Sequence, residues 1–153
     1  MMSGMRVYIT GPMSGEKEFN VPLFNEVAEE LRCMGVDPTN PAEEDSDAVK
    51  ESLANHPDGA APDGLWAECL SRDVGDILTT HYDALVLLPG WATSRGSVLE
   101  CTAAVLEGVT EFYIRMDEGH FTPVTVQDLG FVLSLAIFGR TNPEGVDDDA
   151  TVH

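Results

Sequence analysis

The stretch Asp83-Ala-Leu-Val-Leu-Leu-Pro-Gly-Trp-Ala-Thr-Ser-Arg-Gly-Ser-Val-Leu-Glu-Cys-Thr-Ala-Ala-Val-Leu-Glu-Gly108 decides the fold of this chain. Its residues 84–88 form an uninterrupted apolar run that Pro89 and Gly90 close, which is typical of a strand buried on both faces of a parallel sheet. A helix is predicted to start at Gly96 or Ser97 and to end at Gly108, with enough apolar positions to cover that sheet. The stretch therefore predicts one strand–loop–helix unit of an α/β fold.

The loop inside this unit carries a serine, an arginine and a glycine, Ser94, Arg95 and Gly96, and the first helical turn carries Glu100. Ligands of open α/β sheets bind where strands end and helices begin, because unpaired backbone N–H groups and the helix dipole face the crevice there. The three loop residues suit a phosphate group. The Glu100 carboxylate, one turn inside the helix, is placed to take part in a reaction next to that phosphate.

The rest of the chain alternates in the same way. Further strands are predicted over residues 6–10, 36–40 and 111–116, and further helices over 20–35, 65–80 and 125–138, with Asn20 and Thr125 as N-caps. This alternation predicts a single-domain α/β protein with a doubly wound parallel sheet, flavodoxin-like or Rossmann-like, in the order 2-1-3-4 with a short fifth strand as an option. The domain then covers residues 1–138, and residues 139–153, rich in Pro, Gly and Asp, form a flexible tail.

Two further segments bear on a ligand site. The first strand runs directly into Gly11-Pro-Met-Ser14-Gly15, a glycine-bracketed turn that lets the backbone approach a ligand closely. In the predicted strand order this turn lies beside the loop that carries Arg95. Residues 42–63 are acidic and then rich in Pro and Gly, which indicates a short helix and a loop. That loop is either a lid over the site or a solvated surface insertion.

Composition narrows the possible functions. The chain has 153 residues, 8 Lys and Arg against 27 Asp and Glu, and a formal charge of −19, while 43% of its residues are hydrophobic. The apolar fraction favours a folded chain, and the acidic surface is typical of proteins from high-salt cells, although an ordinary acidic protein remains an alternative. No basic patch exists to bind nucleic acid.

The sequence predicts a cytoplasmic protein without a membrane segment, because it contains neither a secretory signal nor a run of 18 apolar residues. Cys33, Cys69 and Cys101 are odd in number and widely spaced, so we expect reduced core residues. The four histidines lack metal-ligand spacing, and no metal is expected.

Three motifs together resemble the nucleoside 2-deoxyribosyltransferase superfamily: Tyr8-Ile-Thr-Gly-Pro-Met-Ser-Gly15, then Arg72-Asp73, then Leu88-Pro-Gly-Trp91 with Ser94-Arg-Gly-Ser-Val-Leu-Glu100. The resemblance spans residues 6–109. It is nearest to a phage-associated branch of unknown function and to the 2'-deoxynucleoside 5'-monophosphate N-glycosidases.

The resemblance implies a role for each motif residue. Glu100 would face the anomeric carbon as nucleophile or charge stabiliser, Asp73 would orient sugar hydroxyls or protonate the leaving base, and Tyr8 would orient Glu100. A 5'-phosphate would be held by Gly11, Ser14, Gly15, Ser94, Arg95, Gly96 and Ser97, and Trp91 would cover the base or sugar. Each residue also has a purely structural interpretation, from helix-dipole stabilisation by Glu100 to core packing by Tyr8.

Relatives that act on free nucleosides carry an acidic residue near the position of Ser94, which this chain lacks. The resemblance therefore implies hydrolysis of a nucleoside 5'-monophosphate, without cofactor or metal, in a nucleotide-clearing and viral setting. Base exchange by a deoxyribosyltransferase and a non-catalytic nucleotide sensor are the alternatives. The apolar residues 131–138 of the last helix predict a homodimer or larger homo-oligomer.

Overall fold

The computed structural model describes residues 2–141, which contain one five-stranded sheet in the order β2-β1-β3-β4-β5. The strands are β1 (Arg6–Thr10), β2 (Asp37–Thr39), β3 (Ala84–Leu87), β4 (Glu111–Asp117) and β5 (His120–Val124). The α-helices are α1 (Val21–Cys33), α2 (Pro41–Glu44), α3 (Asp47–Ala54), α4 (Leu65–Thr79), α5 (Arg95–Leu106) and α6 (Val126–Thr141). Two short 3-10 helices, η1 (Lys17–Asn20) and η2 (Trp91–Thr93), precede α1 and α5.

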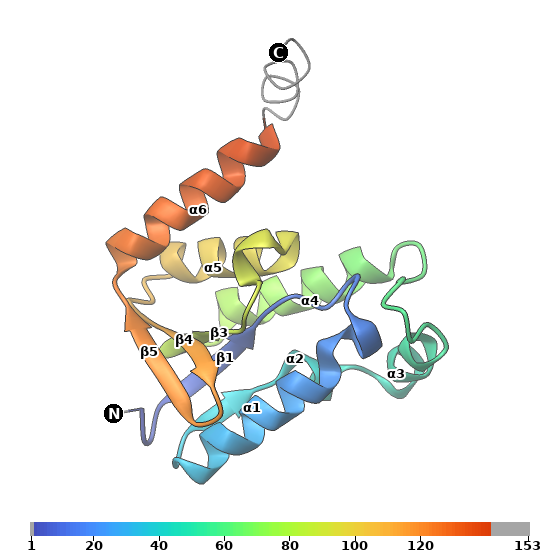
Figure 1. Ribbon diagram of the computed structural model, residues 1–153, viewed down its shortest axis with the longest axis horizontal. Helices are drawn as coiled ribbons and strands as arrows, with labels where there is room; N and C mark the ends of the chain where they lie inside the picture. Colours follow the sequence, from blue (N-terminus) through green and yellow to red (C-terminus); the bar gives the residue numbers. More distant parts are fainter. Residues whose placement is uncertain (1, 142–153) are drawn as a thin grey trace.

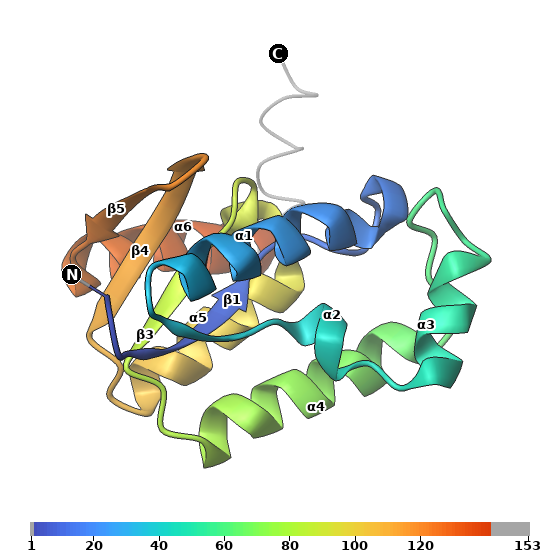
Figure 2. The same cartoon turned by 90° about the horizontal axis from the view of Figure 1, so that it is seen from below.

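Helices cover both faces of the sheet, as Figures 1 and 2 show. On one face, alternate residues of β1 and β3 pack against the apolar stripe of α1, which contains Phe24, Val27 and Leu31. On the other face, the intervening residues of the same strands pack against α4, α5 and the start of α6. Because β3 is buried on both sides, its residues are all apolar. The predicted doubly wound α/β fold is confirmed.

The first four strands pair in parallel in the predicted order 2-1-3-4. The fifth strand, β5, lies antiparallel to β4, so the sheet is mixed and not wholly parallel. Only Glu118 and Gly119 separate these two strands, and Gly119 has a φ of +73°. A two-residue connection can join only antiparallel strands, whereas a parallel crossover needs a dozen residues or more.

One predicted helix start and the capping role of Asn20 need correction. Helix α5 begins at Arg95, because the side chain of Ser94 accepts a hydrogen bond from the backbone N–H of Ser97 and so caps the helix. Asn20 does not cap α1 through its side chain. It has a φ of +60°, and its side chain donates to the Pro12 carbonyl instead, which ties the start of α1 to the loop after β1.

The acidic segment forms two helices, α2 and α3, followed by a connection over residues 55–64. This connection is held by backbone hydrogen bonds to the loop after β1, from Gly15 N–H to the Gly59 carbonyl and from Glu18 N–H to the Pro57 carbonyl. A Cβ atom at Gly59 would lie 2.2 Å from the Glu16 carbonyl oxygen, so only glycine fits there. The segment is therefore packed beside the glycine-bracketed turn.

The last helix is capped by Thr125, as predicted, since its hydroxyl accepts from the Asp128 N–H. It extends to Thr141, past the predicted start of the tail at residue 139, and residues 142–153 lie outside the described part of the chain. None of the helices within residues 2–141 combines the length and the apolar character needed to cross a membrane.

Candidate functional site

The loops after β1 and β3 lie against each other at the carboxyl edge of the sheet. The Leu88 N–H donates to the Thr10 carbonyl over 2.9 Å. A Cβ atom at Gly11 would lie 2.7 Å from the Leu88 Cβ, so the two strands can approach this closely only with glycine at that position. The predicted convergence of the two loops is present in the structure.

Glu100 lies directly behind these loops. Helix α5 places its side chain in the buried layer between α5 and the sheet, where the residue is 6% exposed. Its carboxylate accepts hydrogen bonds from the Tyr8 hydroxyl over 3.1 Å and from the Thr10 hydroxyl over 3.4 Å. Tyr8 and Thr10 are two residues apart on β1 and so point to the same face of the sheet. Strand β1 thus supplies two donors to one buried carboxylate.

Asp73 is the second buried carboxylate of the site and comes from α4. Arg72 donates to it over 2.6 and 2.8 Å, and donates also to the Asp45 carboxylate and to the Pro41 carbonyl. Asp45 follows α2, so one guanidinium links α4 to the acidic segment. The motif residues Arg72 and Asp73 thus form an ion pair in which Asp73 is buried and the Arg72 side chain is 34% exposed.

The two carboxyl groups have different proton affinities. Burial raises the pKa of Glu100 to about 8; the nearby Asp73 charge adds to the rise, and the Tyr8 and Thr10 hydrogen bonds oppose it. Burial also raises the pKa of Asp73, to about 6, against the opposing effect of Arg72. Glu100 therefore holds a proton more tightly than Asp73, and burial together with the adjacent Glu100 charge raises the pKa of Tyr8 well above its usual value.

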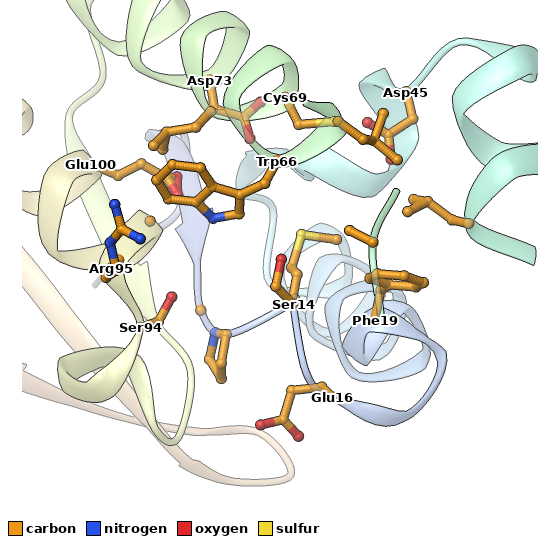
Figure 3. Close-up of a pocket in the computed structure, with 18 of the residues that line it drawn as sticks. Ser14, Glu16, Phe19, Asp45, Trp66, Cys69, Asp73, Ser94, Arg95 and Glu100 are labelled. Atoms are coloured by element: carbon orange, nitrogen blue, oxygen red, sulfur yellow. The ribbon is translucent and has the colours of Figure 1, made fainter. Parts of the chain in front are cut away.

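A cavity of about 540 Å³ opens in front of these groups, bounded by the loops after β1 and β3, by η1 and by α4 and α5. Its lining includes Gly11, Ser14, Asp73, Ser94, Arg95, Gly96 and Glu100 from the predicted set. Figure 3 shows Ser94 and Arg95 on one side of this cavity and Phe19 and Asp45 on the opposite side. The start of α5 thus faces the cavity through residues that precede Glu100 by one turn.

Trp66 also lines the cavity, near the start of α4. The Arg95 guanidinium lies 4.6 Å from the centre of its indole ring, within the range of a cation–π interaction. Figure 3 shows the indole and the guanidinium side by side. A flat aromatic surface and a positive charge are therefore held together at the cavity.

Four predicted site residues do not line the cavity. Trp91 lies in η2, is 8% exposed and packs in the core with residues of α5 and α6, outside the cavity lining. Gly15 uses its N–H on the Gly59 carbonyl. Ser97 is fully buried, and its N–H bonds to Ser94. Tyr8 reaches the site only through Glu100. The prediction that Trp91 covers the base or sugar at the cavity is therefore wrong. Gly15 and Ser97 do not present their N–H groups to the cavity.

Three residues of the site were not predicted: Thr10, Asp45 and Trp66. The sequence holds a signal for two of them. Thr10 shares the side of β1 that carries Tyr8, and Trp66 lies seven residues before Asp73, on the same face of a helix. Asp45 has no such local signal, since its contact with Arg72 joins residues 27 positions apart.

The cysteines differ from the prediction of three core residues. Cys101 is buried, but Cys33 is exposed and Cys69 lines the cavity. All three are free thiols, and burial raises the pKa of Cys69 to about 11. Within residues 2–141, no three His, Cys, Asp or Glu side chains are grouped so that they could hold a metal ion.

The fold and the site define a class: an α/β protein with a doubly wound sheet, a cavity at the carboxyl edge and two buried carboxylates of unlike proton affinity. The chain belongs to the family described as Domain of unknown function (DUF4406), whose model matches residues 5–110. That range contains every site residue named above. No curated protein matches the chain.

Proposed function

We propose that the protein hydrolyses the N-glycosidic bond of a nucleoside 5'-monophosphate, releasing the base and a sugar phosphate. The observation that carries the proposal is the pair of buried carboxyl groups, Glu100 and Asp73, with pKa values near 8 and 6 at one cavity. Glycosidic cleavage commonly divides its work between two such groups. The proposal also rests on the motif resemblance to the nucleoside 2-deoxyribosyltransferase superfamily.

Glu100 acts in its ionised form on the anomeric carbon. Its two hydrogen-bond donors, Tyr8 and Thr10, stabilise the anion and fix the carboxylate in one orientation. Because both pKa values are raised and the two groups interact, they titrate as a pair, and the reactive form is the one that leaves the proton on Asp73 and the charge on Glu100. Positive charge that develops on the sugar favours the anion further, so the stabilisation is greatest in the transition state.

Asp73 serves the leaving base. As the bond from the anomeric carbon to the base breaks, its electron pair passes to the base nitrogen, which takes a proton from the Asp73 carboxyl group. The anomeric carbon is bonded to, or stabilised by, the Glu100 carboxylate. A water oxygen then bonds to that carbon, the Glu100 carboxylate is released, and the water proton returns to Asp73. Arg72 holds Asp73 in place throughout.

The phosphate binds at the start of α5. Because Ser94 caps the Ser97 N–H, the backbone N–H groups of Arg95 and Gly96 remain as the unbonded donors expected in a first helical turn. The Arg95 guanidinium adds a positive charge at the same place. Trp66 supplies a surface for the base or the sugar, in the role that was predicted for Trp91.

Incubation with a panel of nucleosides and nucleoside 5'-monophosphates, followed by chromatography for free base, tests the proposal. We expect base release from monophosphates, slower release from nucleosides, and none from Glu100→Gln. Glu107→Gln removes an exposed carboxylate from the end of the same helix and should leave the rate unchanged. Release that survives Glu100→Gln would refute the mechanism.

The same panel separates the alternatives. A deoxyribosyltransferase would release base from a nucleoside only when an acceptor base is added, and the new nucleoside would be seen. A sensor would show no release under any condition, while a nucleotide still raised the melting temperature.

A further inference from the structure

Arg72 pairs with Asp73 unevenly. The Nε and Nη2 atoms of the guanidinium both donate to the same oxygen of Asp73, Oδ1, over 2.8 and 2.6 Å. In a two-pronged pair between arginine and a carboxylate, each oxygen accepts one of the two hydrogen bonds. Among the hydrogen bonds made within residues 2–141, none reaches the other oxygen, Oδ2. That oxygen is therefore left to hold a proton.

The remaining nitrogen of the guanidinium is held by Asp45. Nη1 donates to Asp45 Oδ1 over 2.5 Å, and the Asp45 side chain is only 4% exposed. Nη2 donates also to the Pro41 carbonyl over 3.3 Å. Pro41 begins α2 and Asp45 directly follows it, so this one-turn helix binds the Arg72 guanidinium at both of its ends.

Helix α2 is itself fixed in place. The Asn40 side chain caps the helix, and its amide donates to Asn25 of α1 over 2.9 Å. On the outer side of α2, Arg32 of α1 donates to Glu43 over 2.7 Å. Two polar contacts thus tie α2 to α1, and Asp45 approaches the guanidinium from a firmly held segment.

The charges around Asp73 do not cancel, because one guanidinium faces two carboxylates. Burial is the largest cause of the raised pKa of Asp73; the charge of Asp45 adds to the rise, and Arg72 opposes it. The other titratable groups that interact with Asp73 come from α4, α5 and β1, and they are Cys69, Asp76, Glu100 and Tyr8. Of all these groups, Asp45 alone also binds the cation that neutralises Asp73.

We propose that Asp45 is a positioning residue: it holds Arg72 on one oxygen of Asp73, so that the other oxygen keeps the proton for the leaving base. This role rests on the proposed function, in which Asp73 protonates that base. Without the Asp45 charge, the guanidinium is free to bond to both oxygens of Asp73, which favours the carboxylate form. Asp73 then loses its proton at lower pH.

The pH dependence of the reaction should change in a specific way. The reactive form has its proton on Asp73 and its charge on Glu100, although Glu100 has the higher pKa. The population of this form falls about tenfold for each unit by which the two pKa values move apart. In Asp45→Asn, kcat at neutral pH should fall by that factor, and the acid limb, near pH 6 in the wild type, should move to lower pH. KM should stay constant, because Asp45 acts through Arg72 and not on the substrate.

Carboxyl ¹³C NMR titration measures the pKa of Asp73 without substrate, and its signal is identified by its absence from Asp73→Asn. The pKa should fall from about 6 in the wild type by about one unit in Asp45→Asn. Asp45→Glu keeps the charge and should keep the raised pKa, since the adjoining cavity has room for one more methylene group. Asp47→Asn is the matched control, because it removes an exposed carboxylate from the same segment, and it should change neither the pKa nor kcat.

Base-release assays on the same variants, over the pH range of the titration, give kcat and KM. If the wild type releases no base, the proposed function fails, while a lowered pKa in Asp45→Asn still supports the action of Asp45 on Asp73. Circular dichroism should show that all variants are folded.

Five outcomes would overturn the role of Asp45. The first is a wild-type Asp73 with its ordinary pKa of 3.8, which needs no variant. The second is a pKa that stays or rises in Asp45→Asn, and the third is an equal fall in Asp45→Glu or Asp47→Asn. The fourth is a lowered pKa with an unchanged kcat. The fifth is a change confined to KM, which would make Asp45 a substrate contact.

Discussion

Replacing Glu100 by glutamine should stabilise the protein, and by an amount that depends on pH. The unfolded chain carries Glu100 with its ordinary pKa of 4.5, whereas burial raises the pKa to about 8 in the folded protein. Below pH 4.5 both states hold the proton. Between pH 4.5 and about pH 8, the unfolded chain has lost the Glu100 proton and the folded protein has kept it. Unfolding therefore releases a proton in this range, and rising pH favours unfolding.

The size of the effect follows from the two pKa values. Each pH unit between them lowers the free energy of unfolding by about 1.4 kcal/mol. At pH 7 the loss is about 3 kcal/mol, and above pH 8 it levels off near 5 kcal/mol, given the pKa change from 4.5 to about 8. Glutamine does not titrate. The difference in stability between Glu100→Gln and wild type should therefore grow across this range.

Urea unfolding at pH 5, 6, 7 and 8, at constant ionic strength, measures this difference. A fixed offset from the exchange of carboxyl for amide against Tyr8 and Thr10 does not change with pH, so the slope is the result that counts. Glu107→Gln should run parallel to wild type. Parallel curves for Glu100→Gln and wild type would refute the raised pKa, and with it the division of labour between the two carboxyl groups.

Three more predictions concern the proposed reaction and the stability of the loop beside the site. In Asp73→Asn, the remaining kcat/KM should rise with pH, because Glu100 must ionise to act. The midpoint of this rise should lie below pH 8, because the variant lacks the Asp73 charge that raises the pKa of Glu100. A kcat/KM that falls with pH would make Glu100 the proton donor. Gly59→Ala should lower the free energy of unfolding by about 1–3 kcal/mol in urea, because Gly59 has a φ of +84° and no space for a Cβ atom. Between 0.1 and 1 M NaCl, the KM for a nucleoside monophosphate should fall, while the KM for the corresponding nucleoside should stay constant. The reason is that salt screens the repulsion between the phosphate dianion and a protein of charge −19. A KM that rises with salt would show instead that attraction by Arg95 dominates.

The sequence was most informative where local pattern and topology agree. The apolar run of β3, closed by Pro89 and Gly90, predicted a buried parallel strand, and α/β alternation then fixed the strand order. That order placed Gly11 beside the loop after β3 and Glu100 behind both. The close approach of Gly11 to Leu88 confirms the geometry on which the site prediction depended.

The errors fall where contacts join distant segments. Trp91 follows a glycine in a loop, and nothing local tells whether its indole turns toward the cavity or into the core, as it does. Trp66 takes the place at the cavity because α4 packs along α5 and brings the indole to Arg95. Gly15 was expected to bind phosphate, but its N–H is taken by Gly59, 44 residues further on.

The buried polar residues of this fold are not spread evenly through its core. On the α5 side of the sheet, β1 presents Tyr8 and Thr10 where apolar side chains would pack more favourably, and α4 and α5 place Asp73 and Glu100 opposite them. Each carboxylate is partly compensated by hydrogen bonds, yet both keep raised pKa values, so the arrangement lowers stability at neutral pH. A core selected for stability alone would not place two such groups at one sheet edge, next to a cavity and a helix start. That concentration is the physical reason to regard this edge as the functional site.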